Sequence, residues 1–158
     1  MMRLLVLSDS HGDYISLKMA IDNTRDADVI VFLGDGINDI ERISETPIVA
    51  DKRIISVRGN CDGSFCGHPA LAIENLGGIK VYCTHGYNEK VKYGYQMLME
   101  RATDAGATLA LFGHTHTPYT SYENGLYVMN PGSVRENSCG IADITPNGIL
   151  CFTKKIVT

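Results

Sequence analysis

The chain has 158 residues, five cysteines and a formal net charge of −4. This length is enough to bury a core without disulfide bonds or a structural metal, so we expect one domain over residues 1–158 in which any metal serves chemistry. The acidic balance argues against generic binding of nucleic acid or of an anionic membrane surface, because both need a basic face.

The sequence carries no sign of export or membrane insertion. A strand-like run begins at Arg3 without a preceding apolar leader, and no run approaches the length that spans a bilayer. An odd number of cysteines without paired spacing fits a reducing compartment. We therefore expect a soluble cytoplasmic protein, in which Cys83, Cys139 and Cys151 are small core residues. Whether it forms a homo-oligomer stays open.

Three short apolar runs in the first half predict buried strands. A continuous apolar run is typical of a strand that is covered on both faces. The runs span residues 3–7, 29–33 and 54–57. Between the first two, Asp13 can cap a helix over about residues 14–24.

The second half is richer in strands. Gly-Gly and Asn-Gly pairs separate short runs, which is a pattern typical of hairpins. The expected strands span residues 70–76, 79–83, 109–112, 120–123, 126–130, 140–145 and 149–157. One long helical pattern covers residues 91–105. The strands are too many for one small sheet, so we expect an α/β fold with two packed sheets and helices outside.

Histidines and acids follow the ends of these strands. His114 and His116 stand one residue apart beyond residues 109–112. Outside a strand the side chains no longer alternate between two faces, so both rings can converge on one point. In chain order, the loop groups are Asp9, His11, Asp35, Asn60, His85, His114 and His116. Mixed oxygen and nitrogen donors suit divalent ions such as Mn, Fe, Ni, Co or Zn, and seven donors are too many for one ion.

Taken singly, these residues have ordinary explanations. Two loop histidines can simply be solvated, and Asp35 and Asn60 can be turn residues. His85 can be a strand-end histidine that is satisfied by hydrogen bonds. Their joint occurrence beyond five strands favours a metal centre.

The order and spacing of five motifs resemble those of the calcineurin-like metallophosphoesterases. The motifs are Asp9-Ser10-His11, Gly34-Asp35, Gly59-Asn60-Cys61-Asp62, Thr84-His85-Gly86 and Gly113-His114-Thr115-His116. The short chain, Cys61 and the segment Asn130-Pro131-Gly132-Ser133 are most similar to the small bacterial and archaeal phosphodiesterase branch of that family.

This resemblance implies a fold and an activity. The fold is a four-layer α-β-β-α sandwich of two packed mixed β-sheets flanked by helices. The activity is that of a metal-dependent phosphodiesterase, in which water or hydroxide activated by two ions attacks phosphorus in line. Manganese is the preferred metal, and a small phosphodiester is the expected substrate. One ion would be held by Asp9, His11, Asp35 and His116, and the other by Asp35, Asn60, His85 and His114. Asp35 would then bridge the two.

Three neighbours of Asn60 complete the candidate catalytic set with Asp35 and Asn60. Arg58 is either a phosphate contact or a surface charge. Cys61 stands where many family members have a histidine, and a thiol is a weak proton donor, so leaving-group protonation is in doubt. Alternatively, Cys61 is a metal-proximal or redox-sensitive thiol, or a small residue that opens the pocket. Asp62 either tunes a ligand or caps a turn.

Two rival functions use the same fold. One is a protein-binding scaffold, like the retromer subunit that resembles these enzymes but has lost catalysis. The other is a phosphate or nucleotide sensor without turnover. The role of Cys66 stays open, and the candidates for substrate specificity are His68, Tyr87, Tyr119 and Tyr122.

Overall fold

A computed structural model describes residues 1–157 and places ten strands in two sheets. The first sheet has the order β10-β9-β1-β2-β3, in which β1, β2 and β3 are parallel and β9 and β10 are antiparallel to their neighbours. Its strands are β1 (Met2–Leu7), β2 (Val29–Phe32), β3 (Arg53–Ser56), β9 (Ser138–Thr145) and β10 (Gly148–Lys155).

The second sheet has the order β4-β5-β6-β8-β7 and is also mixed. The pairs β5-β6 and β6-β8 are parallel, whereas the two hairpins β4-β5 and β7-β8 are antiparallel. Its strands are β4 (Leu71–Leu76), β5 (Ile79–Thr84), β6 (Leu109–Leu111), β7 (Tyr119–Glu123) and β8 (Leu126–Asn130).

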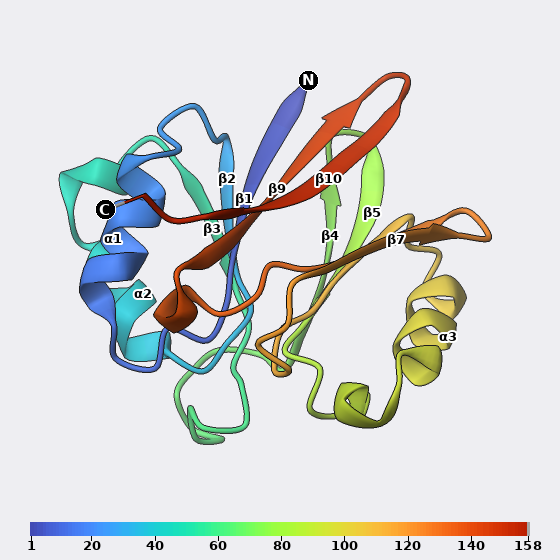
Figure 1. Ribbon diagram of the computed structural model, residues 1–158, viewed down its shortest axis with the longest axis horizontal. Coiled ribbons are helices and arrows are strands. Elements are labelled where there is room, and N and C mark those ends of the chain that lie inside the picture. The colour runs from blue at the N-terminus through green and yellow to red at the C-terminus, as the bar shows by residue number, and fades with distance from the viewer. Residues whose placement is uncertain (158) are drawn as a thin grey trace.

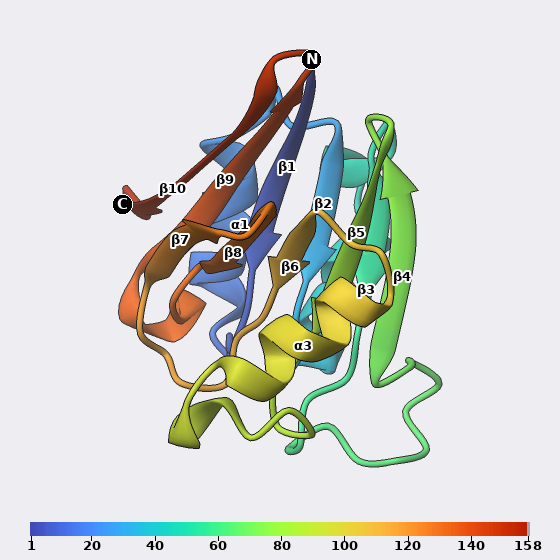
Figure 2. The same cartoon turned by 90° about the vertical axis from the view of Figure 1, so that its right-hand side faces the viewer.

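Three helices cover the outer faces of the sheets (Figures 1 and 2). The first sheet is covered by α1 (Tyr14–Asp22) and α2 (Ile37–Ser44), and the second by α3 (Gln96–Asp104). Short 3-10 turns occupy Pro47–Val49, Val91–Tyr93 and Val134–Glu136. The four-layer α-β-β-α sandwich of two packed mixed sheets is therefore confirmed. No helix within residues 1–157 is long and apolar enough to cross a membrane.

Alternation along β1 explains why its apolar run is unbroken. Leu5 and Leu7 point into the core beneath α1 and α2. Leu4 and Val6 point the other way, into the core between the two sheets. Since both faces of β1 are covered, polar residues do not alternate with apolar ones, and the strand is apolar from Leu4 to Leu7. A third core, which includes Leu98 of α3, lies on the outer face of the second sheet.

One helical expectation needs correction, and one helix was missed. Residues 91–105 do not form one helix, because Lys90 and Gly94 adopt left-handed φ angles of 54° and 132° on either side of a short 3-10 turn. Helix α2 was not expected, because its N-cap is Gly36, which makes no side-chain cap. Its apolar face, with Ile40 and Ile43, was the sequence signal that could have revealed it.

Among the cysteines, Cys83 and Cys139 are buried as expected, and Cys151 is only partly buried at the edge of the inter-sheet core. Cys66 is also partly buried and packs against the core beneath α1 and α2. Cys66 lies in the loop between β3 and β4, where its side chain packs against this core.

Candidate metal centre

The loops that leave β1, β2, β3, β5 and β6 gather at one end of the sandwich (Figure 1). Parallel strands place their carboxyl ends together, so groups far apart in sequence meet there. Five of the seven predicted donors adopt left-handed φ angles between 44° and 70°, namely Asp9, His11, Asp35, His114 and His116. Such backbone costs free energy for residues other than glycine, and it clusters at functional sites.

Glycines allow these loops to approach each other closely. A Cβ atom on Gly59 would overlap the carboxylate of Asp35, and one on Gly113 would overlap the hydroxyl of Ser8. The motif glycines therefore serve close packing of the loops around the acids.

The first group of donors surrounds Asp9. Its Oδ1 lies 3.2 Å from Nε2 of His116 and 3.5 Å from Nε2 of His11, and the two ring nitrogens are 3.3 Å apart. The other oxygen, Oδ2, accepts hydrogen bonds from the Ser8 hydroxyl and the His114 backbone amide. These bonds fix the carboxylate so that Oδ1 faces the histidines.

The second group surrounds Asp35. Nε2 of His85 lies 3.3 Å from Oδ2 of Asp35 and 3.2 Å from Nδ1 of His114. On the other side of its ring, Nδ1 of His85 donates to the Leu33 carbonyl at 2.7 Å. That bond leaves Nε2 of the neutral ring as an acceptor directed into the cluster.

The residues present fit divalent cations. Oδ1 of Asp9 is buried without a hydrogen-bond partner, which is costly for a carboxylate oxygen unless a cation faces it. The facing ring nitrogens of His11 and His116 are 3.3 Å apart and those of His85 and His114 are 3.2 Å apart, so each pair directs two imidazole donors at one place. Oxygen and imidazole donors together suit transition metals and zinc.

Electrostatics within the cluster supports the same conclusion. Burial acts to raise the pKa of Asp35, but the hydrogen bond and charge of His85 and the Cys61 amide outweigh it and lower that pKa to about 2. Burial acts to lower the pKa of His85, yet Asp35 and Asp9 raise it. Burial and the charge of His85 both lower the pKa of His114, which keeps that ring neutral. The Asp35 carboxylate is thus ionised at neutral pH.

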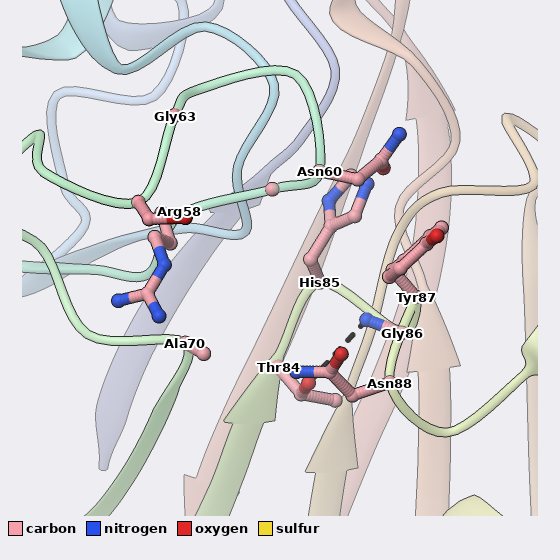
Figure 3. A pocket seen from close by; sticks show the side chains of 11 residues that line it. Arg58, Asn60, Gly63, Ala70, Thr84, His85, Gly86, Tyr87 and Asn88 are labelled. Carbon is pink, nitrogen blue, oxygen red and sulfur yellow. Dashed lines mark hydrogen bonds between the residues drawn. The ribbon is translucent and has the colours of Figure 1, made fainter.

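Asn60 and Cys61 border the cluster on one loop. Asn60 is exposed and lies beside His85, with which it lines the same cavity (Figure 3). The backbone amide of Cys61 donates to Oδ1 of Asp35 at 2.8 Å, and its sulfur groups with His11 and Asp35 among the candidate ligand atoms. Burial, together with the negative charge of Asp35, raises the pKa of the thiol, so Cys61 is protonated at neutral pH.

Asp62 binds backbone amides rather than the side chains of the cluster. Its two oxygens accept four backbone N–H donors, at 2.6 to 3.1 Å, from Asp35, Gly36, Ile37 and Gly59. It therefore caps the first turn of α2 from a distant loop and fixes the backbone of Asp35. Of the two roles expected for Asp62, this geometry favours the cap, and the same carboxylate also holds the backbone amide of Asp35, a predicted ligand.

Arg58 lines the same cavity as His85, and its Nη1 donates to the His68 carbonyl at 2.8 Å. The ring of His68 contacts Ser56 and Glu41, which places it outside the cluster. Tyr87 lies edge-on to His114, with ring centroids 5.6 Å apart.

The other two specificity candidates pack against aromatic residues outside the cluster. Tyr119 packs against Tyr95 and Phe112, and Tyr122 packs against Tyr127 in the β7-β8 hairpin. Of the four candidates, the side chain of Tyr87 alone lies beside a cluster residue.

A family model described as the calcineurin-like phosphoesterase superfamily domain matches residues 2–145. The chain belongs to this superfamily. It is 31% identical, over 137 residues, to the probable metallophosphoesterase YsnB of Bacillus subtilis, a match that covers 85% of this chain and 76% of the relative. The family implies divalent metal ions and hydrolysis of phosphoesters.

Two solved structures share the calcineurin-like fold. An archaeal phosphodiesterase superposes with a TM-score of 0.77 at 19% identity, over 97% of this chain and 100% of that one. Vacuolar protein sorting 29 from Cryptosporidium parvum superposes with a TM-score of 0.74 at 14% identity, over 99% of this chain and 98% of that one. At these identities, the likeness shows the fold alone.

Several residues that support the phosphoesterase site were not anticipated from sequence. Asp39 of α2 accepts hydrogen bonds from the Ser10 hydroxyl at 2.6 Å and the Gly12 amide at 2.9 Å, which braces the first loop. Buried Asn130 donates to the Gly113 carbonyl at 3.0 Å and thereby braces the loop of the paired histidines. Asn130 ends a strand, as the expected ligands do, and that signal could have identified it.

A buried acid also supports the loop after β5. Glu89 accepts hydrogen bonds from the hydroxyls of Tyr82 at 3.0 Å and Thr84 at 2.9 Å. The contacts tie the loop that follows His85 back onto its own strand. This role has no signal in the sequence pattern, because an isolated loop glutamate is normally solvated.

Proposed function

We propose that the protein is a phosphodiesterase that holds two divalent ions, with manganese the first candidate, and hydrolyses small phosphodiesters. One observation carries the proposal: Oδ2 of Asp35 lies 3.3 Å from Nε2 of His85 and 3.8 Å from Nε2 of His11, so a single oxygen faces both donor groups. When bound, the ions would make hydroxide available near neutral pH and neutralise phosphate oxygens.

Two sets of residues, which share Asp35, would each hold one ion. One ion would be held by Asp9, His11, Asp35 and His116, and the other by Asp35, Asn60, His85 and His114. The hydrogen bond from His85 to Leu33 orients that imidazole before any ion arrives. The neutral amide of Asn60 limits the negative charge around a site that must also accept an anionic substrate.

The test combines metal content with turnover. Protein reconstituted with Mn²⁺ should contain two ions per chain and should hydrolyse bis(p-nitrophenyl) phosphate faster than p-nitrophenyl phosphate. Full activity at one ion per chain would contradict the two-ion centre. A preference for the monoester would contradict the assignment as a diesterase.

The same measurements address the alternatives of a sensor and a protein-binding scaffold. A sensor would bind metal and phosphate without turnover, and a scaffold needs neither. Six acid and imidazole donors directed at one another give no support to a scaffold that has lost its metal site. A metal-loaded protein inactive on both esters would favour the sensor.

A further inference from the structure

The loops after β3 and β5 enclose a cavity of about 260 Å³ beside the cluster. His85 and Asn60 form one wall, and Arg58 lies across the cavity from them (Figure 3). Tyr87 and Asn88 lie on the same side as His85. Because His85 also belongs to the donor cluster, the cavity opens directly from the place where the phosphoester would be held.

The charge of this cavity differs from that of the other side of the cluster. Among residues 1–157, no aspartate or glutamate lines it, and Arg58 supplies a permanent positive charge. A second cavity of about 200 Å³ on the other side is lined by three acids, Asp35, Asp39 and Asp62. In a protein with a net charge of −4, only the Arg58 side therefore suits an anionic group.

Arg58 is held in place without being neutralised. Its Nη1 donates to the His68 carbonyl and its backbone amide donates to the Pro69 carbonyl, each at 2.8 Å. Within the described residues it forms no ion pair, whereas Arg3 and Arg53 each pair with an acid. A guanidinium carries five N–H donors in a planar fork that matches phosphate and carboxylate. The fixed fork is therefore preorganised for an anion.

We propose that this cavity binds one ester arm of the substrate, and that this arm carries a second anionic group, a phosphate or a carboxylate, that Arg58 recognises. The inference rests on the proposed phosphodiesterase function and specifies its substrate class. The volume is below the roughly 300–1,000 Å³ of pockets that hold drug-sized ligands, so the arm is short. The Asn88 amide and the Tyr87 hydroxyl offer neutral hydrogen bonds to a hydroxylated linker.

A matched pair of substrates tests the assignment. Propyl p-nitrophenyl phosphate and 3-phosphonopropyl p-nitrophenyl phosphate share the leaving group and differ only in the second anion. On the Mn²⁺-loaded protein, kcat/KM should be about 10- to 100-fold higher for the anionic diester, which corresponds to charge-assisted hydrogen bonds to one guanidinium.

Two variants separate recognition by Arg58 from general attraction. Arg58→Gln should bring the ratio of the two kcat/KM values close to one, since a contact to the second anion raises kcat/KM for the anionic diester alone. Lys92→Ala is the matched control, because Lys92 is a cation whose charge acts on His114 but which does not line the cavity. It should preserve the ratio.

The possible failures are distinguishable. Equal rates on the two diesters, unchanged in Arg58→Gln, would overturn the cavity assignment and leave the phosphodiesterase standing. If the protein hydrolysed neither diester, the proposed function would be overturned. Calorimetry on the Mn²⁺-loaded protein would then test whether the cavity binds an anion. Tighter binding of propane-1,3-diphosphonate than of propylphosphonate, lost in Arg58→Gln, would support the anion site, and equal binding would overturn it.

Discussion

Nε2 of His85 lies 3.3 Å from Oδ2 of Asp35, and this contact joins the loop after β5 to the loop after β2. The two residues come from different sheets, so their contact spans the sandwich at its loop end. The same Asp35 oxygen lies 3.8 Å from His11. A single carboxylate therefore couples the two donor groups.

Removing the charge of Asp35 should cost more activity than removing either paired histidine. We expect Asp35→Asn to lower kcat/KM by about 10² to 10³, the usual range for losing one preorganised electrostatic contact. His114→Ala and His116→Ala should each lose less, because each ring serves one donor group. Elemental analysis alongside the assay is required. If Asp35→Asn kept normal turnover and metal content, Asp35 would not be the bridge.

The contact between His85 and Asp35 should make the stability of the metal-free protein depend on pH. The folded pKa of Asp35 is lowered to about 2, so its contribution is complete above its unfolded pKa of about 3.9 and is lost as pH falls towards 2. The folded pKa of His85 is raised, so its contribution is complete below its unfolded pKa of about 6.5 and is lost as pH rises through the folded value. Both contributions to the free energy of unfolding are therefore complete between about pH 4 and 6.5.

The corresponding measurement is a Tm series on metal-free protein, with His85→Gln as the comparison. The Tm difference between the two proteins should be largest between about pH 4 and 6.5 and should shrink on either side. A constant difference across this range would show that the pair does not titrate as described. Metal binding should also release protons in this range, which calorimetry in buffers of different ionisation enthalpy would detect.

Much of this site was predictable because its groups follow strands. The apolar runs that became β1, β2 and β6 stand out since both faces of each strand are covered, and each run ends two residues before Asp9, Asp35 or His114. Distances between the loops were not predictable from one sequence. They depend on parallel pairing within each sheet and on the packing of one sheet against the other.

Long-range hydrogen bonds explain what sequence patterns missed. Helix α2 lacks a local capping side chain, and its cap comes from Asp62, 25 residues beyond Ile37. Local rules for helix starts consider only neighbouring residues, so neither the helix nor the role of Asp62 was apparent. The break at Gly94 likewise follows from its φ of 132°, whereas the apolar spacing around it looks continuous.

Asp62 should therefore matter for both stability and metal binding. Asp62→Ala leaves four backbone donors without their acceptor, so we expect it to lower the free energy of unfolding by about 2–3 kcal/mol and metal affinity by about 10- to 100-fold. Asp13→Ala, which removes the α1 cap on Ser16, is the matched control. It should cost about 1 kcal/mol and leave metal affinity within a few-fold of the parent.

Denaturant unfolding and metal titration on both variants make this comparison. Asp62→Asn adds a sharper test, because the amide keeps one acceptor oxygen but loses the charge and the second acceptor. Its losses should fall between those of the parent and of Asp62→Ala. Equal metal affinity in Asp62→Ala and Asp13→Ala would mean that Asp62 caps the helix without positioning Asp35.

Because position 61 holds a cysteine, we expect the leaving-group oxygen to receive little general acid catalysis. Its thiol is protonated at neutral pH but is a weak donor, and the oxygens of Asp62 are already occupied by backbone amides. General acid catalysis typically contributes about 10² to 10⁴ in rate. We therefore expect aryl diesters to react far faster than alkyl diesters, because aryl oxide leaves without protonation.

The measurement is a series of diesters with graded leaving-group pKa, run on the parent and on Cys61→His at matched metal occupancy. The parent should show a steep dependence of kcat/KM on leaving-group pKa. Cys61→His should flatten it by accelerating the alkyl esters, because an imidazole can donate the proton that the thiol gives poorly. Cys61→Ser is the matched control, because serine is similar in size to cysteine. Its kcat/KM should keep the steep dependence on leaving-group pKa. A flat dependence in the parent would show that another acid protonates the leaving group or that chemistry does not limit the rate.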